Sequence, residues 1–330
     1  MGSLNRSWVE MTAEEYHAAP GLSSSALRCF VLEGELAYYN KYVLRRGTAR
    51  ESDALRLGKL FHLGMERPSD WQDEVLIVPP AVPDPLDQIA LLINAGTSPA
   101  AAKLIPGAAW NEKLSSHRQY RDVMMDMAKA QGKHFIRHSE FEQVKSQINA
   151  VWDNTAAKEI LTGNHLQSEM ACFAETSKLP FKLKALLDNH YDDCVVDFKT
   201  TRFLNWADFI RDGYRNGYHY QMAYYCLVTG LKRAKIIAIT NEPPYEANVF
   251  VMGKDRIRQL IEGDPHKSDG LKDHIKDIAQ KFYSLSLQAS ITTDSEGVPL
   301  EWHHERWGQP IPFDPAAATG AELPEDNEDQ

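Results

Sequence analysis

Three consecutive strands are the clearest prediction from the pattern of apolar and polar positions. They are expected at Leu166 to Glu175, Phe181 to Asp188, and Cys194 to Lys199. Short turns separate them, which is typical of an antiparallel meander. Residues two apart on a strand point to the same face, so Asp197 and Lys199 project together while Phe198 points the other way, into a core.

Helical periodicity predicts helices on both sides of this meander. Ser23 to Ser25 and Ser52 offer N-caps for two of them. The helices are expected at residues 23–30, 35–42, 52–66, 87–94, 117–131, from 139, at 205–215, at 218–229, and once or twice within 254–286. Further strands are expected at Glu74 to Val78, Lys235 to Thr240, and Val249 to Met252. The whole pattern predicts an α/β fold with a central mixed sheet flanked by helices.

The chain has 330 residues and 43% hydrophobic residues, which is ample for a core. This length suits one elaborated α/β domain. We expect one domain over residues 1–290, with helical elaborations over about 20–165. Residues 291–330 are expected to form an aromatic docking segment around Trp302 to Trp307 and a disordered acidic tail.

Neither a membrane span nor a disulfide framework is expected. No apolar run approaches the roughly 18 to 20 residues that a spanning helix needs, and the first residues lack the apolar segment of a signal peptide. The four cysteines are widely spaced and form no C-x-x-C motif, which argues against a zinc knuckle or an iron–sulfur cluster. We therefore expect a soluble, cytoplasmic protein with reduced core cysteines.

Two carboxylates and a lysine form the candidate site. If Asp188 ends the strand beside the one that carries Asp197, two hard oxygen ligands can hold Mg²⁺ together with a phosphate. Lys199 could then assist a metal-bound water or neutralise charge on a phosphodiester transition state. The alternative is an ion pair between Asp197 and Lys199 and a turn that begins at Asp188. Asp192 and Asp193 are expected only to form the turn between the strands.

The net charge of −10 is unusual for a protein that binds DNA, but the charge is unevenly distributed. Residues 314–330 carry six acidic and no basic side chains, whereas basic residues outnumber acidic ones between Lys41 and Lys59. Such a patch can neutralise phosphates locally; the alternative is a solvated helix face. The candidate phosphate contacts are Ser25, Arg45, Arg46, Arg50, Lys59 and Thr200.

The order of motifs resembles the RecB-like branch of the PD-(D/E)XK nuclease superfamily. The motifs are Gly58-Lys-Leu-Phe-His62, Asp188, Asp197-Phe-Lys199, and Gln221-x-x-x-Tyr225. The flanking sequence looks more narrowly like the exodeoxyribonuclease VIII (RecE-type) exonucleases, over roughly residues 20–260. Gly21 to Leu27 resembles the serine-rich helix start of that family. Leu186 departs from its pattern, which often has an arginine two residues before the first aspartate.

The resemblance implies an αβββαβ core, a metal site and a reaction. His62, Asp188, Asp197 and the Phe198 backbone carbonyl would hold Mg²⁺ or Mn²⁺, and imidazole suits Mn²⁺ better. Lys199 would assist the attacking water. Gln221 and Tyr225 would orient substrate, and Glu169 is a candidate outer-shell carboxylate.

The activity implied is 5′→3′ resection of double-stranded DNA ends to 3′ single strands, in phage-type recombination within a bacterial or phage-infected cell. A homo-oligomeric ring and a single-strand annealing protein of the RecT type are the expected partners. Two alternatives stay open. One is an endonuclease or repair nuclease on the same fold, and the other is a catalytically inactive DNA-binding module.

Overall fold

A central mixed sheet organises the chain. The computed structural model describes residues 3–44, 46, 52–68, 71–78, 115–163, 167–191, 193–264 and 268–287. Within them, seven strands form this sheet in the order β1-β5-β6-β7-β8-β9, with β2 paired to β6. Their bounds are β1 Asn5–Glu10, β2 Leu22–Ser23, β5 Gln167–Glu175, β6 Leu183–Tyr191, β7 Cys194–Thr201, β8 Arg233–Thr240 and β9 Ala247–Met252.

The strand directions confirm the predicted meander. β5, β6 and β7 pair antiparallel in sequence order, whereas β7 and β8 are parallel. A parallel pair needs a crossover connection, and α9 (Trp206–Arg215) and α10 (Tyr218–Thr229) provide it. The α/β class and the central mixed sheet flanked by helices are thereby confirmed.

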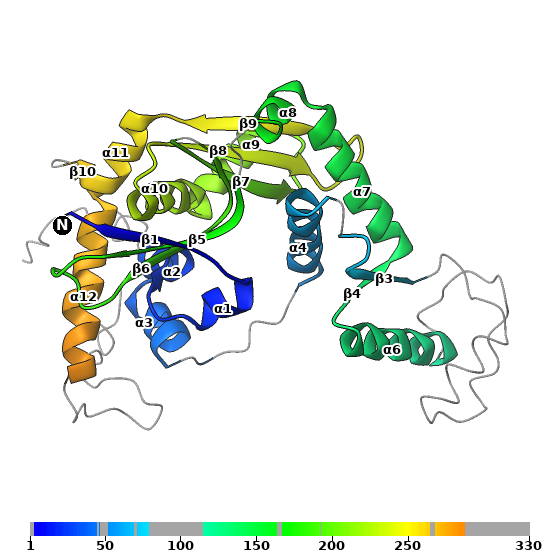
Figure 1. Ribbon diagram of the computed structural model, residues 1–330, viewed down its shortest axis with the longest axis horizontal. Helices are drawn as coiled ribbons and strands as arrows, with labels where there is room; N and C mark the ends of the chain where they lie inside the picture. Colours follow the sequence, from blue (N-terminus) through cyan, green and yellow to red (C-terminus); the bar gives the residue numbers. More distant parts are fainter. Residues whose placement is uncertain are drawn as a thin grey trace, which may run out of the picture.

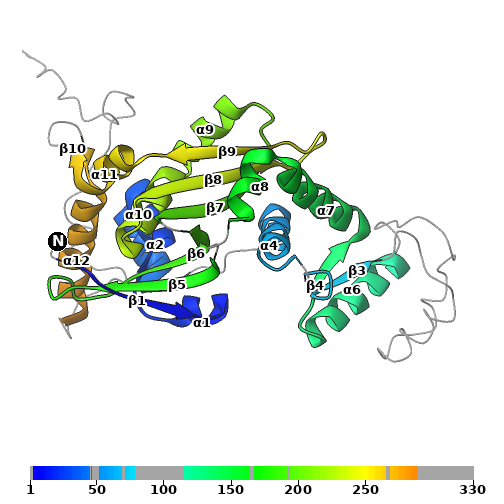
Figure 2. The ribbon, with the colours of Figure 1, turned by 45° about the horizontal axis from the view of Figure 1, so that its top comes forward.

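Helices cover both faces of the sheet (Figures 1 and 2). One core cluster contains residues of α2 (Ser24–Glu33), α10, α11 (Lys254–Glu262) and α12 (Leu271–Leu287), and the other contains residues of α4 (Asp53–Glu66), α7 (His138–Asp153) and α8 (Thr155–Leu161). On β7, Val195 belongs to the first cluster and Val196 and Phe198 to the second. Because strand side chains alternate, Asp197 and Lys199 share the α10 side of β7.

Side-chain caps fix where the two N-terminal helices begin. The Ser23 hydroxyl accepts a hydrogen bond from the Ala26 N–H at 3.3 Å and starts α2. The Ser52 hydroxyl accepts from the Leu55 N–H at 3.2 Å and starts α4. Both predicted caps are confirmed. Between these helices lie α3 (Glu35–Tyr38) and a π-helical segment η1 (Tyr39–Val43).

The first twenty residues hold two elements that periodicity did not predict, β1 and α1 (Ala13–Ala18). Tyr16 and Lys184 attach α1 to the sheet reciprocally. The Lys184 ammonium donates to the Tyr16 and Ala19 carbonyls at 2.8 and 2.6 Å, and the Tyr16 hydroxyl donates to the Lys184 carbonyl at 3.1 Å. A buried lysine therefore has a structural role on β6.

A smaller unit of α6 (Ser115–Ala130), β3 (Val75–Val78) and β4 (His134–Arg137) stands apart from the main sheet in both views (Figures 1 and 2). β3 and β4 pair in parallel. The helix predicted near 117–131 and the strand near 75–78 are confirmed, while β4 was not predicted. The helix predicted at 87–94 and the segment predicted at 291–330 lie outside the described residues, so the proposed domain division stays a prediction.

A short two-stranded sheet lies between the two C-terminal helices of the described chain. Short strands β10 (Gly263–Asp264) and β11 (Ser268–Asp269) pair between α11 and α12. All four cysteines are buried and free, as predicted. Among the described helices, none combines the length and apolar character that crossing a membrane requires.

Candidate active site

Asp197 and Lys199 form a buried ion pair on β7. The Lys199 ammonium donates to Asp197 Oδ2 and, at 3.3 Å, to the Phe198 carbonyl. The Asp197 side chain is 2% exposed and that of Lys199 is 16% exposed. The two side chains therefore point to the same face of β7, as predicted. The ion pair lies inside the protein rather than on its surface.

Asp188 lies where β6 and β7 separate. The last residue pair of their ladder before this point is Asn189 with Val196. Asp188 Oδ2 then accepts a hydrogen bond from the Phe198 N–H at 2.8 Å. The prediction that the strand ends at Asp188 is wrong, because β6 continues to Tyr191. Only the pairing of β6 with β7 ends near Asp188. The Asp188 carboxylate there accepts from the Phe198 N–H, which has no partner in the ladder between the two strands.

α4 brings His62 and Glu66 to Asp188. His62 Nδ1 lies 3.3 Å from Asp188 Oδ2 and 3.7 Å from Glu66 Oε1. The ligand atoms of these three residues all lie within 4.8 Å of one another. Asp197 does not belong to this group within the described part of the chain. Glu66 was missed from the sequence, although its position four residues after His62 on a helix places both on one face.

The charges of these groups depend on one another. Burial would lower the pKa of His62, but the charge of Asp188 and hydrogen bonds to Asp188 and Glu66 raise it to about 10. Burial would raise the pKa of Asp188, but His62, Lys199 and the Phe198 N–H lower it. Burial raises the pKa of Asp197 against the opposing charge of Lys199. His62 and Lys199 thus oppose the negative charge of three carboxylates, Glu66, Asp188 and Asp197.

Gln221 and Tyr225 lie on α10 behind Asp197. The Gln221 amide nitrogen donates to Asp197 Oδ1 at 3.1 Å and to the Tyr225 hydroxyl at 2.9 Å. Its oxygen accepts from Arg28 Nη1 at 3.1 Å. The Tyr225 hydroxyl also contacts the Ser24 side chain. The structure thus gives Gln221 the role of holding Asp197, whereas its expected contact with substrate stays a prediction.

Aromatic rings enclose the lysine and the histidine. The Lys199 ammonium lies 5.2 Å from the centre of the Tyr218 ring, within the range of a cation–π contact. Phe198 packs edge to face against Phe61 and His62, at ring-centre distances of 6.0 and 5.9 Å. These rings exclude water from one side of the site and so strengthen its electrostatic interactions. The importance of Tyr218 was not apparent from the sequence.

The donors present fit a divalent cation of the Mg²⁺ or Mn²⁺ type. Two carboxylates and one imidazole converge at His62, Glu66 and Asp188. The Asp197 carboxylate and the Phe198 carbonyl, both contacted by Lys199, lie on the adjacent strand. Oxygen ligands suit Mg²⁺, and a mixed set with imidazole suits Mn²⁺. Imidazole must lose its proton to bind a metal, so a cation here would compete with a proton on His62.

Glu169 and Asp193 occupy different surroundings. Glu169 lies on β5 opposite Asp188 in register, since Ser168 pairs with Asn189 and Met170 with Leu187; its side chain lies outside the described part of the chain. Asp193 contacts Arg233 and stands 3.7 Å from Lys254. That ion pair fits the prediction that Asp193 belongs to a turn and takes no part in the site.

The candidate phosphate contacts are only partly placed. Arg45 and Arg50 lie outside the described residues. The structure shows Arg46, Lys59 and Ser25 as exposed and Thr200 as half-buried. Another member of the basic stretch, Arg56, bonds to Glu140 at 2.7 Å and so has a structural partner.

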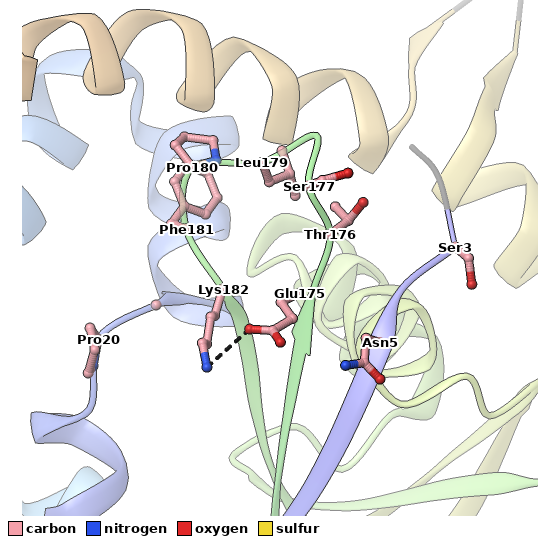
Figure 3. A pocket seen from close by; sticks show the side chains of 11 residues that line it. Ser3, Asn5, Pro20, Glu175, Thr176, Ser177, Leu179, Pro180, Phe181 and Lys182 are labelled. Carbon is pink, nitrogen blue, oxygen red and sulfur yellow. Dashed lines mark ion pairs between the residues drawn. The ribbon is translucent and has the colours of Figure 1, made fainter.

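One open cavity in the described part of the chain lies away from these residues. A cavity of about 750 Å³ opens beside the β5–β6 hairpin (Figure 3). Glu175 and Lys182 form an ion pair of 3.1 Å within it. None of its lining residues is one of the site residues above, so the candidate active site is a separate feature.

The fold and the buried Asp-x-Lys pair define a nuclease-like protein of the PD-(D/E)XK class. Residues 23–281 match the model of a family described as a PDDEXK-like domain of unknown function (DUF3799). The chain belongs to that family. No curated protein matches the sequence.

Solved structures give weaker likenesses. A "Putative exonuclease" from Eubacterium rectale is 14% identical, with 95% of this chain and all of that chain covered and a TM-score of 0.47. The Candida albicans Rai1 structure in complex with pU5-Mn²⁺ is 12% identical, with 73% of this chain and 76% of that chain covered and a TM-score of 0.28.

Proposed function

We propose that this protein is a metal-dependent 5′→3′ exonuclease of double-stranded DNA. It resects DNA ends to 3′ single strands for phage-type recombination by single-strand annealing. The observation that carries the proposal is the convergence of His62, Asp188, Asp197 and Lys199, which come from one helix and two strands. Membership of a PDDEXK-like family supports a nuclease reaction.

The cation would be held by His62, Asp188, Asp197 and the Phe198 carbonyl, with Glu66 as an added carboxylate. When bound, Mg²⁺ or Mn²⁺ lowers the pKa of a coordinated water and polarises the phosphoryl oxygens. The protein residues supply the fixed geometry. The Phe198 N–H donates to Asp188 and so ties β7 to β6. The Phe198 carbonyl accepts from Lys199, the next residue on β7.

Lys199 is the residue assigned to charge stabilisation. Its ammonium is held by Asp197 and the Phe198 carbonyl, beside the Tyr218 ring. A preorganised positive charge in a site of low dielectric stabilises the negative charge that grows on phosphoryl oxygens in the transition state. The Lys199 ammonium could also lie next to the attacking water and orient that water toward phosphorus.

The proposed 5′→3′ direction of digestion, the oligomeric assembly and the protein partner rest on the resemblance to RecE-type exonucleases. The ordered motifs from Gly58 to Tyr225 support that assignment. It includes a homo-oligomeric ring and an annealing protein of the RecT type that receives the 3′ strand. The residues proposed to contact DNA phosphates are Ser25, Arg45, Arg46, Arg50, Lys59 and Thr200.

The test is digestion of end-labelled duplex DNA with and without Mg²⁺ or Mn²⁺. The proposal predicts stepwise release of 5′ nucleotides from linear DNA with 5′-phosphate or 5′-hydroxyl ends, and no cutting of a covalently closed circle. Cutting of the circle would identify an endonuclease. Binding without any cleavage under all cation conditions would identify an inactive DNA-binding module and overturn the proposal.

A further inference from the structure

We propose that Arg28 is a positioning residue of the active site, which fixes the Gln221 amide so that Gln221 can hold Asp197. The inference rests on the proposed function for its activity readout. Arg28 lies on α2 and was not among the residues singled out from the sequence. It links α2 to the part of the site that lies on β7 and α10.

Three contacts form a continuous chain of hydrogen bonds. Arg28 Nη1 donates to Gln221 Oε1 at 3.1 Å. Gln221 Nε2 donates to Asp197 Oδ1 at 3.1 Å, and the other oxygen of Asp197 accepts from Lys199. Gln221 is 8% exposed and Asp197 is 1% exposed, so little water competes for these bonds.

The Arg28 guanidinium and the Asp197 carboxylate require the same orientation of the Gln221 amide. A glutamine amide has a donor end and an acceptor end, and it can flip between them. Arginine offers donors only, so Gln221 must turn its oxygen toward Arg28. Its nitrogen then faces Asp197 and Tyr225, to which it donates. The Asp197 carboxylate only accepts hydrogen bonds, so it requires the same orientation of the amide. Loss of Arg28 would leave the Gln221 oxygen without the donor that holds it.

The packing of α10 on α2 supports this assignment. Gly217 precedes α10 with φ +71°, and a Cβ there would lie 2.8 Å from Leu32 Cδ1 and 3.4 Å from Arg28 Cγ. Glycine adopts this left-handed conformation without steric cost, and it lets α10 begin directly against the Arg28 stem. Gln221 is one turn further along α10 and therefore reaches the guanidinium.

Arg28 is half-buried, and its bond to Gln221 is partly shielded from water. Its Nε atom is buried and has no hydrogen-bond partner among the described residues. Burial of an unpaired donor costs free energy. The bond from Nη1 to the Gln221 oxygen is a polar contact of the guanidinium that offsets part of this cost. The consequence is a fixed plane for the Asp197 carboxylate, held by Gln221 on one oxygen and by Lys199 on the other.

The test compares Arg28→Met, Arg28→Lys, Gln221→Ala and the double variant Arg28→Met with Gln221→Ala in steady-state cleavage of linear duplex. Outer-shell substitutions reduce activity by roughly 10- to 100-fold. We expect Arg28→Met to lower kcat by that factor with KM within about twofold of wild type. Arg28→Lys, which keeps a donor, should recover part of the loss. In the Gln221→Ala background, Arg28→Met should have no further effect. Arg258→Met, at an exposed arginine on α11, is the matched control.

Two outcomes would overturn the proposal. An increase in KM with unchanged kcat would mean that Arg28 binds substrate directly, and multiplicative losses in the double variant would mean that the two residues act independently. If the wild-type protein cleaves no DNA, the proposed function fails while the positioning role is still testable in urea unfolding. There the stability losses of Arg28→Met and Gln221→Ala should couple, and full additivity would count against the contact.

Discussion

Asp188 accepts a hydrogen bond from the Phe198 backbone N–H at 2.8 Å, one residue beyond the last pair of the β6–β7 ladder. The two strands separate at this point, and the carboxylate satisfies a backbone donor that would otherwise be unpaired and costly. Its contact with His62 at 3.3 Å joins α4 to the same position. The candidate site therefore lies where the pairing between β6 and β7 ends.

Replacement of Lys199 by alanine should remove cleavage and preserve DNA binding. The ammonium is assigned to stabilise charge in the transition state, a contribution of roughly 10²- to 10³-fold in kcat. The measurement pairs the cleavage rate of labelled duplex with fluorescence anisotropy of the same duplex in Ca²⁺. Retained cutting by a clean preparation would contradict the assigned role of Lys199.

Glu66 should contribute to cation binding although it was not predicted from the sequence. Its Oε1 lies 3.7 Å from His62 Nδ1, and loss of one carboxylate should weaken Mn²⁺ binding by about 10-fold. Calorimetry of Glu66→Gln with MnCl₂ measures this change. Glu142→Gln, at an exposed position on α7, should bind as wild type does. Equal affinities for all three proteins would remove Glu66 from the site.

Two glycines of α4 should respond differently to alanine. A Cβ at Gly64 would lie 2.3 Å from Ile148 Cδ1, whereas a Cβ at Gly58 would meet only Thr200 Oγ1 at 3.8 Å. Both variants gain the same helix propensity, about 1 kcal/mol, so their difference isolates overpacking. We expect Gly64→Ala to be less stable than Gly58→Ala by about 1–3 kcal/mol in urea unfolding. Equal stabilities would show that Ile148 moves without cost.

Lys184 should matter for stability and Lys182 should not. The buried Lys184 ammonium bonds to the Tyr16 and Ala19 carbonyls, and its loss leaves these acceptors without that donor, at a cost of about 1–3 kcal/mol. Lys182 forms a surface ion pair with Glu175, with a side chain 56% exposed; such pairs contribute about 0–1 kcal/mol. Unfolding of Lys184→Met and Lys182→Met measures the contrast, and a smaller loss at Lys184 than at Lys182 would contradict it.

The strands and helices with strong periodicity in the sequence were predictable. The three strands before Lys199 and the two helices after Thr201 lie within a few residues of their expected bounds. β1 was not predicted because all six of its residues are exposed, so its sequence has no buried face to give alternation. β4 was not predicted because four residues between two helices carry too little pattern.

The site was predictable where spacing on one element fixes geometry. The common face of Asp197 and Lys199 follows from strand alternation. The contact from Arg28 to Gln221 could not be predicted from the residues alone, because it depends on how α2 docks against α10 across 193 residues of sequence. The position of Asp188 within β6, rather than at its end, likewise depends on where two strands stop pairing.

The most direct test of the account is isothermal titration of the wild-type protein and of Asp188→Asn with MnCl₂. The central claim is that His62, Glu66, Asp188 and Asp197 can hold a divalent cation next to Lys199. The wild-type protein should bind at least one Mn²⁺ per chain, and Asp188→Asn should bind at least about 10-fold more weakly. Absence of Mn²⁺ binding to folded wild-type protein would contradict the claim.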